Sequence, residues 1–164
     1  MKIAYTLAPG RGETNLVLSA LAKTLADRGL RLCGTVQVDT ERENDHHCDM
    51  DVMVLPQGPT IRISQSLGAG SRGCRLDPEA LETAVSMTER ALEHGADLLI
   101  VNKFGKHEAD GRGFRSAIAM ALEKDIPVLV GANKLNLEAL RLFCDDAAEE
   151  IVPDMDDLLA WVAR

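Results

Sequence analysis

The fold is decided by residues 1–38, MKIAYTLAPGRGETNLVLSALAKTLADRGLRLCGTVQV. A short apolar run that begins at Ile3 and ends at a Pro-Gly pair predicts a first strand followed by a loop. Apolar side chains then recur at helical spacing between Leu16 and Leu25. The apolar, β-branched run at 30–38 predicts a second strand. A strand, a helix and a strand in this order form a βαβ unit, whose two strands are parallel.

The rest of the chain continues this alternation. Asp77-Pro78-Glu79 predicts a helix start, because an aspartate cap, a proline and an acid suit the first turn. We expect further helices near 78–94, 113–123, 137–143 and 155–162, strands at 52–55, 60–64, 97–102 and 126–132, and a loop over 39–51. This pattern predicts one domain over 1–164, a three-layer α/β/α fold with a mostly parallel sheet.

Composition narrows the classes of partner. The 164 residues carry a net charge of −8 and only 3% aromatic side chains, so we expect neither nucleic acid nor membrane as a partner. No run of 18 apolar residues occurs, and the first ten residues do not predict an export signal. Four widely spaced cysteines are then typical of reduced thiols. We therefore expect a cytoplasmic protein with an anionic small molecule as its partner, and leave a homodimer open.

Three glycine-rich loops are predicted at the edge where the parallel strands end, which is where open α/β sheets bind ligands. The loops are 8–14, 68–77 and 102–115, and they hold eight of the 13 glycines and a charge of about +3. Glycine lets backbone N–H groups converge on an anion, so a phosphate, nucleotide or oxyanion site is favoured over plain solvated loops. The candidate ligand-binding residues are Gly10, Arg11, Gly12, Thr14, Arg72, Gly73, Arg75, Asn102, Lys103, Lys106, Arg112 and Arg115.

The first loop matches a Walker A motif only in part. Gly12 and Thr14 stand where the motif has its second glycine and its hydroxyl, but Leu7 replaces the first glycine and Glu13 the lysine. A carboxylate at the lysine position opposes β- and γ-phosphates, and Arg11 is the available substitute. The run 97–102 is similar to a Walker B strand whose magnesium position carries a neutral asparagine.

Two other patterns are weaker. Gly10-x-Gly12-x-x-Asn15 is a dinucleotide fingerprint without its third glycine, with Asp39 as the ribose-binding acid. A soft-metal site would need the His46-His47-Cys48 run and Cys74 to meet, and their spacing matches no zinc signature, so no metal site is predicted.

Longer segments carry a resemblance to a known family. They are Gln65–Gly68, Ser71–Asp77 and Val101–Arg115, with Gly34–Gln37 and Cys48–Met50 in addition. With these the chain resembles, over nearly its whole length, the bacterial domain-of-unknown-function family two-four-seven-eight, whose members often lie near molybdate-transport functions.

More distantly the chain is similar to small P-loop nucleoside-triphosphatases. Asn102, Gly105, Lys106 and Glu108 stand at matching places of their Walker B run, but Asn102 replaces the magnesium aspartate and Lys103 a candidate catalytic glutamate. This resemblance implies a P-loop-like fold and does not carry over the hydrolysis.

Four hypotheses follow for function. The first is a nucleotide-, phosphate- or oxyanion-binding protein, with molybdate among the oxyanions. The second is a slow nucleoside-triphosphatase in which Glu108 is the catalytic residue and a nucleotide with magnesium is bound. The third is an NAD-type dinucleotide binder, and the fourth is a non-catalytic partner protein. Whether the chain is an enzyme is left open, and as an enzyme it would be a nucleoside-triphosphatase-like hydrolase.

Overall fold

A seven-stranded sheet forms the centre of the molecule in the computed structural model, which describes residues 1–41, 48–65 and 75–164. The strand order is β4-β3-β2-β7-β8-β1-β9, and a separate two-stranded ribbon pairs β5 with β6. The strands are β1 (Ile3–Thr6), β2 (Leu32–Glu41), β3 (Cys48–Val54), β4 (Thr60–Arg62), β5 (Ser64–Gln65), β6 (Arg75–Leu76), β7 (Leu98–Val101), β8 (Val128–Gly131) and β9 (Glu149–Ile151). The pairs among β2, β7, β8, β1 and β9 are parallel, while β3 and β4 add an antiparallel edge.

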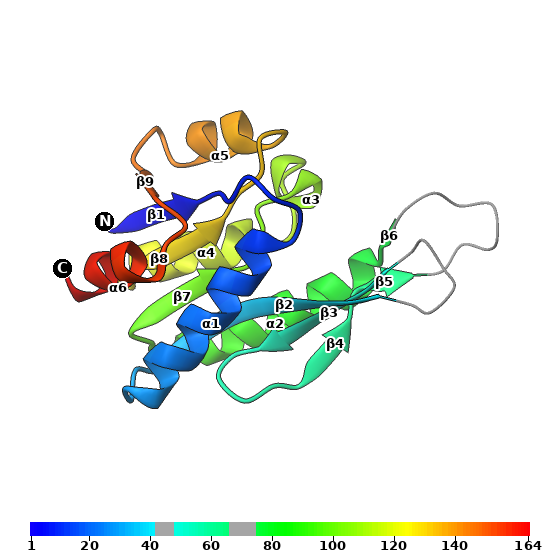
Figure 1. Ribbon diagram of the computed structural model, residues 1–164, viewed down its shortest axis with the longest axis horizontal. Coiled ribbons are helices and arrows are strands. Elements are labelled where there is room, and N and C mark those ends of the chain that lie inside the picture. The colour runs from blue at the N-terminus through cyan, green and yellow to red at the C-terminus, as the bar shows by residue number, and fades with distance from the viewer. Residues whose placement is uncertain (42–47, 66–74) are drawn as a thin grey trace.

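Helices cover both faces of the sheet, which makes the predicted three-layer α/β/α arrangement (Figure 1). The helices are α1 (Glu13–Asp27), α2 (Pro78–Glu93), α3 (Lys106–Ala109), α4 (Arg115–Glu123), α5 (Leu137–Phe143) and α6 (Met155–Ala163). One core packs α1 and α6 against side chains such as Leu98 and Ile100. The other packs α2, α4 and α5 against Leu99 and Val101. Alternate residues of β7 thus enter opposite cores, as expected for a strand buried on both faces.

The start of α2 confirms the predicted cap. The Asp77 carboxylate accepts hydrogen bonds from the backbone N–H groups of Glu79, at 3.1 Å, and Ala80, at 3.3 Å. Pro78 occupies the first helical position, where a missing N–H costs nothing.

Removal of this cap gives the first testable prediction. In Asp77→Ala both N–H groups lose their acceptor, so we expect the free energy of unfolding to fall by about 1 kcal/mol. Urea denaturation measures this loss of stability. The control is Asp77→Asn, which keeps a capping oxygen and should retain most of the stability that the cap contributes. A loss below 0.3 kcal/mol in Asp77→Ala would contradict this role of the cap.

Three parts of the sequence-based prediction were wrong. The stretch 39–51 was expected to be a loop, yet β2 continues to Glu41 and pairs with β3 from Cys48 onward, so its described residues lie in a hairpin. The many charged residues of this stretch led to the loop prediction, although Cys48-Asp49-Met50-Asp51-Val52 alternates apolar and polar side chains as a half-buried strand does. The short strand β9 was missed, and the loop predicted over 68–77 contains β6.

The loops predicted to bind ligands emerge from the sheet as expected in two of three cases. The loop after β1 leads into α1, and the loop after β7 leads into α3, so both lie at the carboxyl edge of the parallel strands (Figure 1). The backbone N–H of Phe104 donates to Gly131 O at 2.8 Å, which fixes the second loop to the end of β8. The third loop falls mostly on 66–74, outside the described residues.

The described segments hold no helix that is both long and apolar enough to cross a membrane. Two of the predicted thiols, Cys33 and Cys144, are free and buried. Burial raises the pKa of the Cys144 thiol to about 11, so this group stays protonated and unreactive near neutral pH.

Candidate functional site

The loop between β1 and α1 is closed by its own side chains. The backbone N–H of Ala8 donates to Thr14 Oγ1 at 2.9 Å, and that of Gly10 donates to Glu13 Oε2 at 3.1 Å. Gly12 sits at the N-cap of α1 with φ of 77°, a left-handed conformation that favours glycine. The loop therefore curls over the first turn of α1, in the arrangement by which a helix start binds an anion.

An anionic group already lies in this loop. Glu13 is the first residue of α1, and its carboxylate bends back onto the Gly10 N–H instead of pointing away. A Cβ on Gly10 would collide with that carboxylate, so the glycine makes room for it. Backbone donors that would face a phosphate in a P-loop are thus partly used by a side chain of the protein. Arg11 is exposed beside them and has no ion-pair partner among the described residues.

Asn102, predicted at the magnesium position, is buried and fully engaged with protein groups. Its Nδ2 donates to Asn15 Oδ1 at 2.9 Å and to Gln37 Oε1 at 3.4 Å, and its Oδ1 accepts from the Gln37 backbone N–H at 3.0 Å. These contacts tie the end of β7 to the first turns of α1 and to β2. The first and second predicted loops are therefore neighbours, as the sequence analysis expected.

Glu108, the candidate catalytic residue, makes contacts of a structural kind. Its side chain is buried, with 3% of the residue exposed, and accepts from the backbone N–H groups of Gly105, at 2.9 Å, and Phe114, at 3.3 Å. This carboxylate caps α3 and holds both ends of the second loop together. Its catalytic assignment stays a prediction.

The predicted cations do not all face one pocket. Lys103 and Lys106 line a cavity of about 240 Å³ together with Asn102 and Glu108, but Lys106 Nζ also pairs with Asp110 at 3.0 Å. Arg115 lies over the Phe143 ring and donates to Glu108 O at 3.4 Å, so it joins α4 to α5 and α3. Local sequence gives the number of charges in a loop, whereas the direction of each side chain depends on packing.

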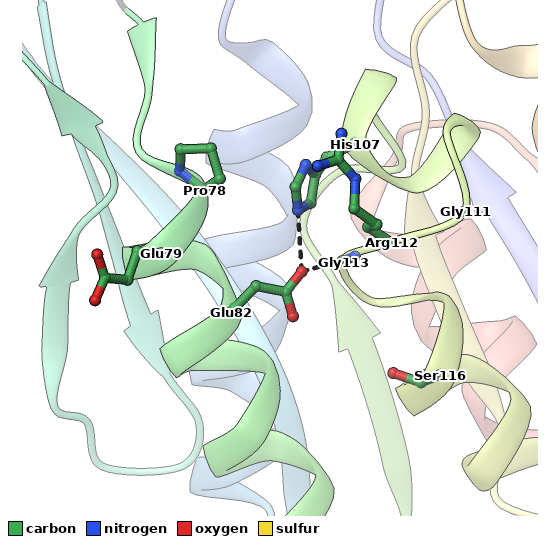
Figure 2. Close-up of a pocket in the computed structure, with 8 residues that line it drawn as sticks. All are labelled: Pro78, Glu79, Glu82, His107, Gly111, Arg112, Gly113 and Ser116. Carbon is green, nitrogen blue, oxygen red and sulfur yellow. Dashed lines mark hydrogen bonds and ion pairs between the residues drawn. The ribbon is translucent and has the colours of Figure 1, made fainter.

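A second hollow lies between α2 and α4, and Arg112 belongs to it. Figure 2 shows Glu82, on α2, pointing at His107 and at the backbone of Gly113, while Glu79 points away. The Ser116 hydroxyl, on α4, donates to Glu89 of α2. Glu82 Oε1 lies 3.0 Å from both His107 Nε2 and Gly113 N. The sequence analysis missed this pair, because its members are 25 residues apart and no motif joins them.

The remaining candidates are placed as follows. Arg75 lies in β6, exposed and paired across the ribbon with Gln65. Arg72, Gly73, His46, His47 and Cys74 lie outside the described residues. Asp39 lies in β2 opposite Met50. The residues that the structure describes contain no group of three or more His, Cys, Asp and Glu side chains that could hold a metal ion.

Comparison with known proteins decides the family. Residues 3–161 match the family described as protein of unknown function (DUF2478). The chain belongs to this family. The match confirms the resemblance that the segments around 65–77 and 101–115 carried.

Two curated relatives are similar in sequence. Molybdenum import ATP-binding protein ModC 2 of Bradyrhizobium diazoefficiens is 30% identical over 160 residues, which are 98% of this chain and 18% of that protein. The chain thus spans less than a fifth of this relative's length. Nucleoside-triphosphatase THEP1 of Methanosarcina barkeri is 27% identical over 131 residues, covering 79% of this chain and 74% of that protein.

A solved structure shares the fold. The solution structure of a human cancer-related nucleoside triphosphatase superposes with a TM-score of 0.61 over 92% of this chain and 87% of that chain, at 16% sequence identity. The three-layer, mostly parallel architecture of this DUF2478 chain is therefore that of a P-loop nucleoside-triphosphatase, as predicted.

Proposed function

We propose that this DUF2478 chain binds a phosphate-bearing anion, a nucleotide above all, through the loop between β1 and α1, and does not hydrolyse it by the usual metal-assisted route. The proposal takes the fold from the structure and takes its ligand class from the similarity to nucleoside-triphosphatase THEP1 and to an ATP-binding protein. Gly10, Arg11, Gly12 and Thr14 would hold the phosphates.

One observation carries the proposal. The Gly10 N–H already donates to a carboxylate, which supports an anionic oxygen as a suitable partner for this donor. The positive end of the α1 dipole faces the same place, because Glu13 is the first residue of that helix. A phosphate oxygen can replace the Glu13 oxygen on the same donor, so ligand binding and this internal contact exclude each other.

The usual hydrolytic machinery does not fit the residues present. P-loop enzymes hold Mg²⁺ with an aspartate at the end of the Walker B strand and neutralise phosphates with a lysine. Here the neutral Asn102 stands at the aspartate position, and its amide is hydrogen-bonded to Asn15 and Gln37. Glu13 stands at the lysine position. With these donors no step through a metal ion can be derived. The chain is therefore proposed as a binding protein.

A titration of the ¹⁵N-labelled chain tests the proposal. We expect ADP and pyrophosphate, in buffer with EDTA, to shift the amide signals of Gly10 and Gly12 with a Kd on the order of 0.1–1 mM. Gly29 and Gly58, which lie in turns elsewhere, serve as internal controls and should not move. ATP turnover should not exceed the protein-free rate. If the signals of Gly10 and Gly12 stay unchanged at 10 mM ligand, the loop is not an anion site.

A second candidate function rests on the ModC 2 alignment. Nearly the whole of this chain corresponds to 18% of that protein, so a unit of this kind occurs there joined to a much longer sequence. We propose, as the alternative, a non-catalytic partner of an ATP-driven transport protein, with molybdate as the oxyanion. The same titration separates the two, because molybdate that shifts Gly10 more strongly than sulfate and ADP would favour this second function.

A further inference from the structure

The cavity of about 240 Å³ is a site that the proposed function does not use. It lies on the α2 side of the sheet, where the middle of β2, at Thr35 and Gln37, and the carboxyl end of β7 meet α3. Its apolar wall includes Val52, Ile63 and Leu81, all of which belong to the core shared with α2. An apolar hollow with a few polar groups is the usual form of a small-molecule site.

Two polar side chains in the cavity lining each carry a polar atom for which no hydrogen bond is found among the described residues. Thr35 is 1% exposed and lines the cavity, yet its hydroxyl makes no hydrogen bond within the described part of the chain. No fully enclosed side-chain N or O atom of the described residues lacks a hydrogen bond, so this hydroxyl must face open space. His107, 8% exposed, lines the cavity as well, and its Nδ1 has no described partner while Nε2 is held by Glu82. Buried polar groups of this kind ordinarily find a partner.

The edge of the cavity carries a free positive charge. Lys103 lines the cavity, is exposed, and forms no ion pair with a described residue. Glu108 also lines the cavity, but its carboxylate accepts hydrogen bonds from two backbone N–H groups. Lys106 is already paired with Asp110. The electrostatics therefore favour an anionic group next to Lys103.

We propose that this cavity is a second binding site, for a small amphipathic organic acid. The apolar body of the ligand packs against Val52, Ile63 and Leu81, a hydroxyl group pairs with the Thr35 hydroxyl, and the acidic group lies at Lys103. The volume suits one ring or a short chain, because sites for drug-sized molecules begin near 300 Å³. The site is separate from the loop between β1 and α1 and does not depend on the function proposed for that loop.

The experiment uses 4-hydroxybenzoate as a probe, with phenol as its uncharged counterpart, and follows methyl signals by NMR. We expect 4-hydroxybenzoate to shift the methyl groups of Val52, Ile63 and Leu81 with a Kd on the order of 1 mM. Methyl groups of Leu18 and Leu21, in the core on the other side of the sheet, should stay in place.

Variants separate the contacts. Lys103→Met should weaken the binding of 4-hydroxybenzoate about fivefold, because its carboxylate lies at the lysine. The same variant should leave the binding of phenol unchanged, because phenol carries no charge. Thr35→Val keeps nearly the same side-chain shape but removes the hydroxyl. It should weaken the binding of both probes about threefold. Lys124→Met, an exposed lysine after α4, is the matched control and should change neither. No methyl shift at 20 mM, equal losses for both probes in Lys103→Met, or shifts at the Gly10 amide instead would overturn the proposal.

Discussion

Replacement of Glu108 by alanine should lower the free energy of unfolding by about 3 kcal/mol. The carboxylate accepts from the backbone N–H groups of Gly105 and Phe114, and the residue is 3% exposed, so its removal deprives two buried N–H groups of their acceptor. Each buried N–H left without an acceptor costs about 1–3 kcal/mol, and hydrogen bonds to a charged group lie at the upper end. The loss follows from the loop after β7 coming apart, independently of any ligand.

The measurement is urea denaturation of matched variants. Glu108→Gln keeps one acceptor oxygen in place, and we expect it to lose about half as much stability. Glu93→Ala, an exposed glutamate at the end of α2, should change the stability by less than 0.5 kcal/mol. A Glu108→Ala protein with the stability of the unchanged chain would contradict the structural role.

The central part of the fold could be predicted from the sequence because its signals are local. The βαβ unit over 1–38, the cap at Asp77 and the apolar run ending at Asn102 each depend on neighbouring residues. The strands within 39–51 were missed because the charged residues of this stretch outweighed the apolar-polar alternation at 48–52. The short β9 has no local signal and becomes a strand by pairing with β1.

The candidate site was predictable in its location but not in its contacts. The glycines and the helix start placed the loop between β1 and α1, whereas nothing in the sequence shows that Glu13 bends back onto Gly10. Asn102 was singled out as a degenerate metal position, and its partners Asn15 and Gln37, 87 and 65 residues away, are visible only in the structure. Arg115 was predicted as a ligand-binding cation, and its contact with the Phe143 ring is visible only in the structure.

The contact between the Glu13 carboxylate and the Gly10 N–H is expected to limit the affinity for ADP. Because the carboxylate occupies a donor of the loop and repels phosphate, its removal should tighten ADP binding. Glu13→Ala, which only frees the donor, should bind ADP about threefold more tightly. Glu13→Lys also places a cation near the phosphates, and two unit charges about 5 Å apart near a surface interact by roughly 1–3 kcal/mol. We therefore expect about a tenfold or larger gain for Glu13→Lys.

Asp27→Lys provides the control for overall charge. It makes the same change of charge at the opposite end of α1, where Asp27 pairs with the exposed Lys23. Its effect on ADP affinity should stay below twofold at 0.15 M salt, because the two ends of a 15-residue helix lie beyond the screening length.

The most direct test of anion binding by this loop is the Kd of ADP, measured by calorimetry in EDTA, for the unchanged chain and these three variants. Binding should be tightest in Glu13→Lys, intermediate in Glu13→Ala, and weakest and equal in Asp27→Lys and the unchanged chain. Equal affinities for all four proteins, or a gain in Asp27→Lys that matches Glu13→Lys, would show that the anion does not bind where the Glu13 carboxylate lies.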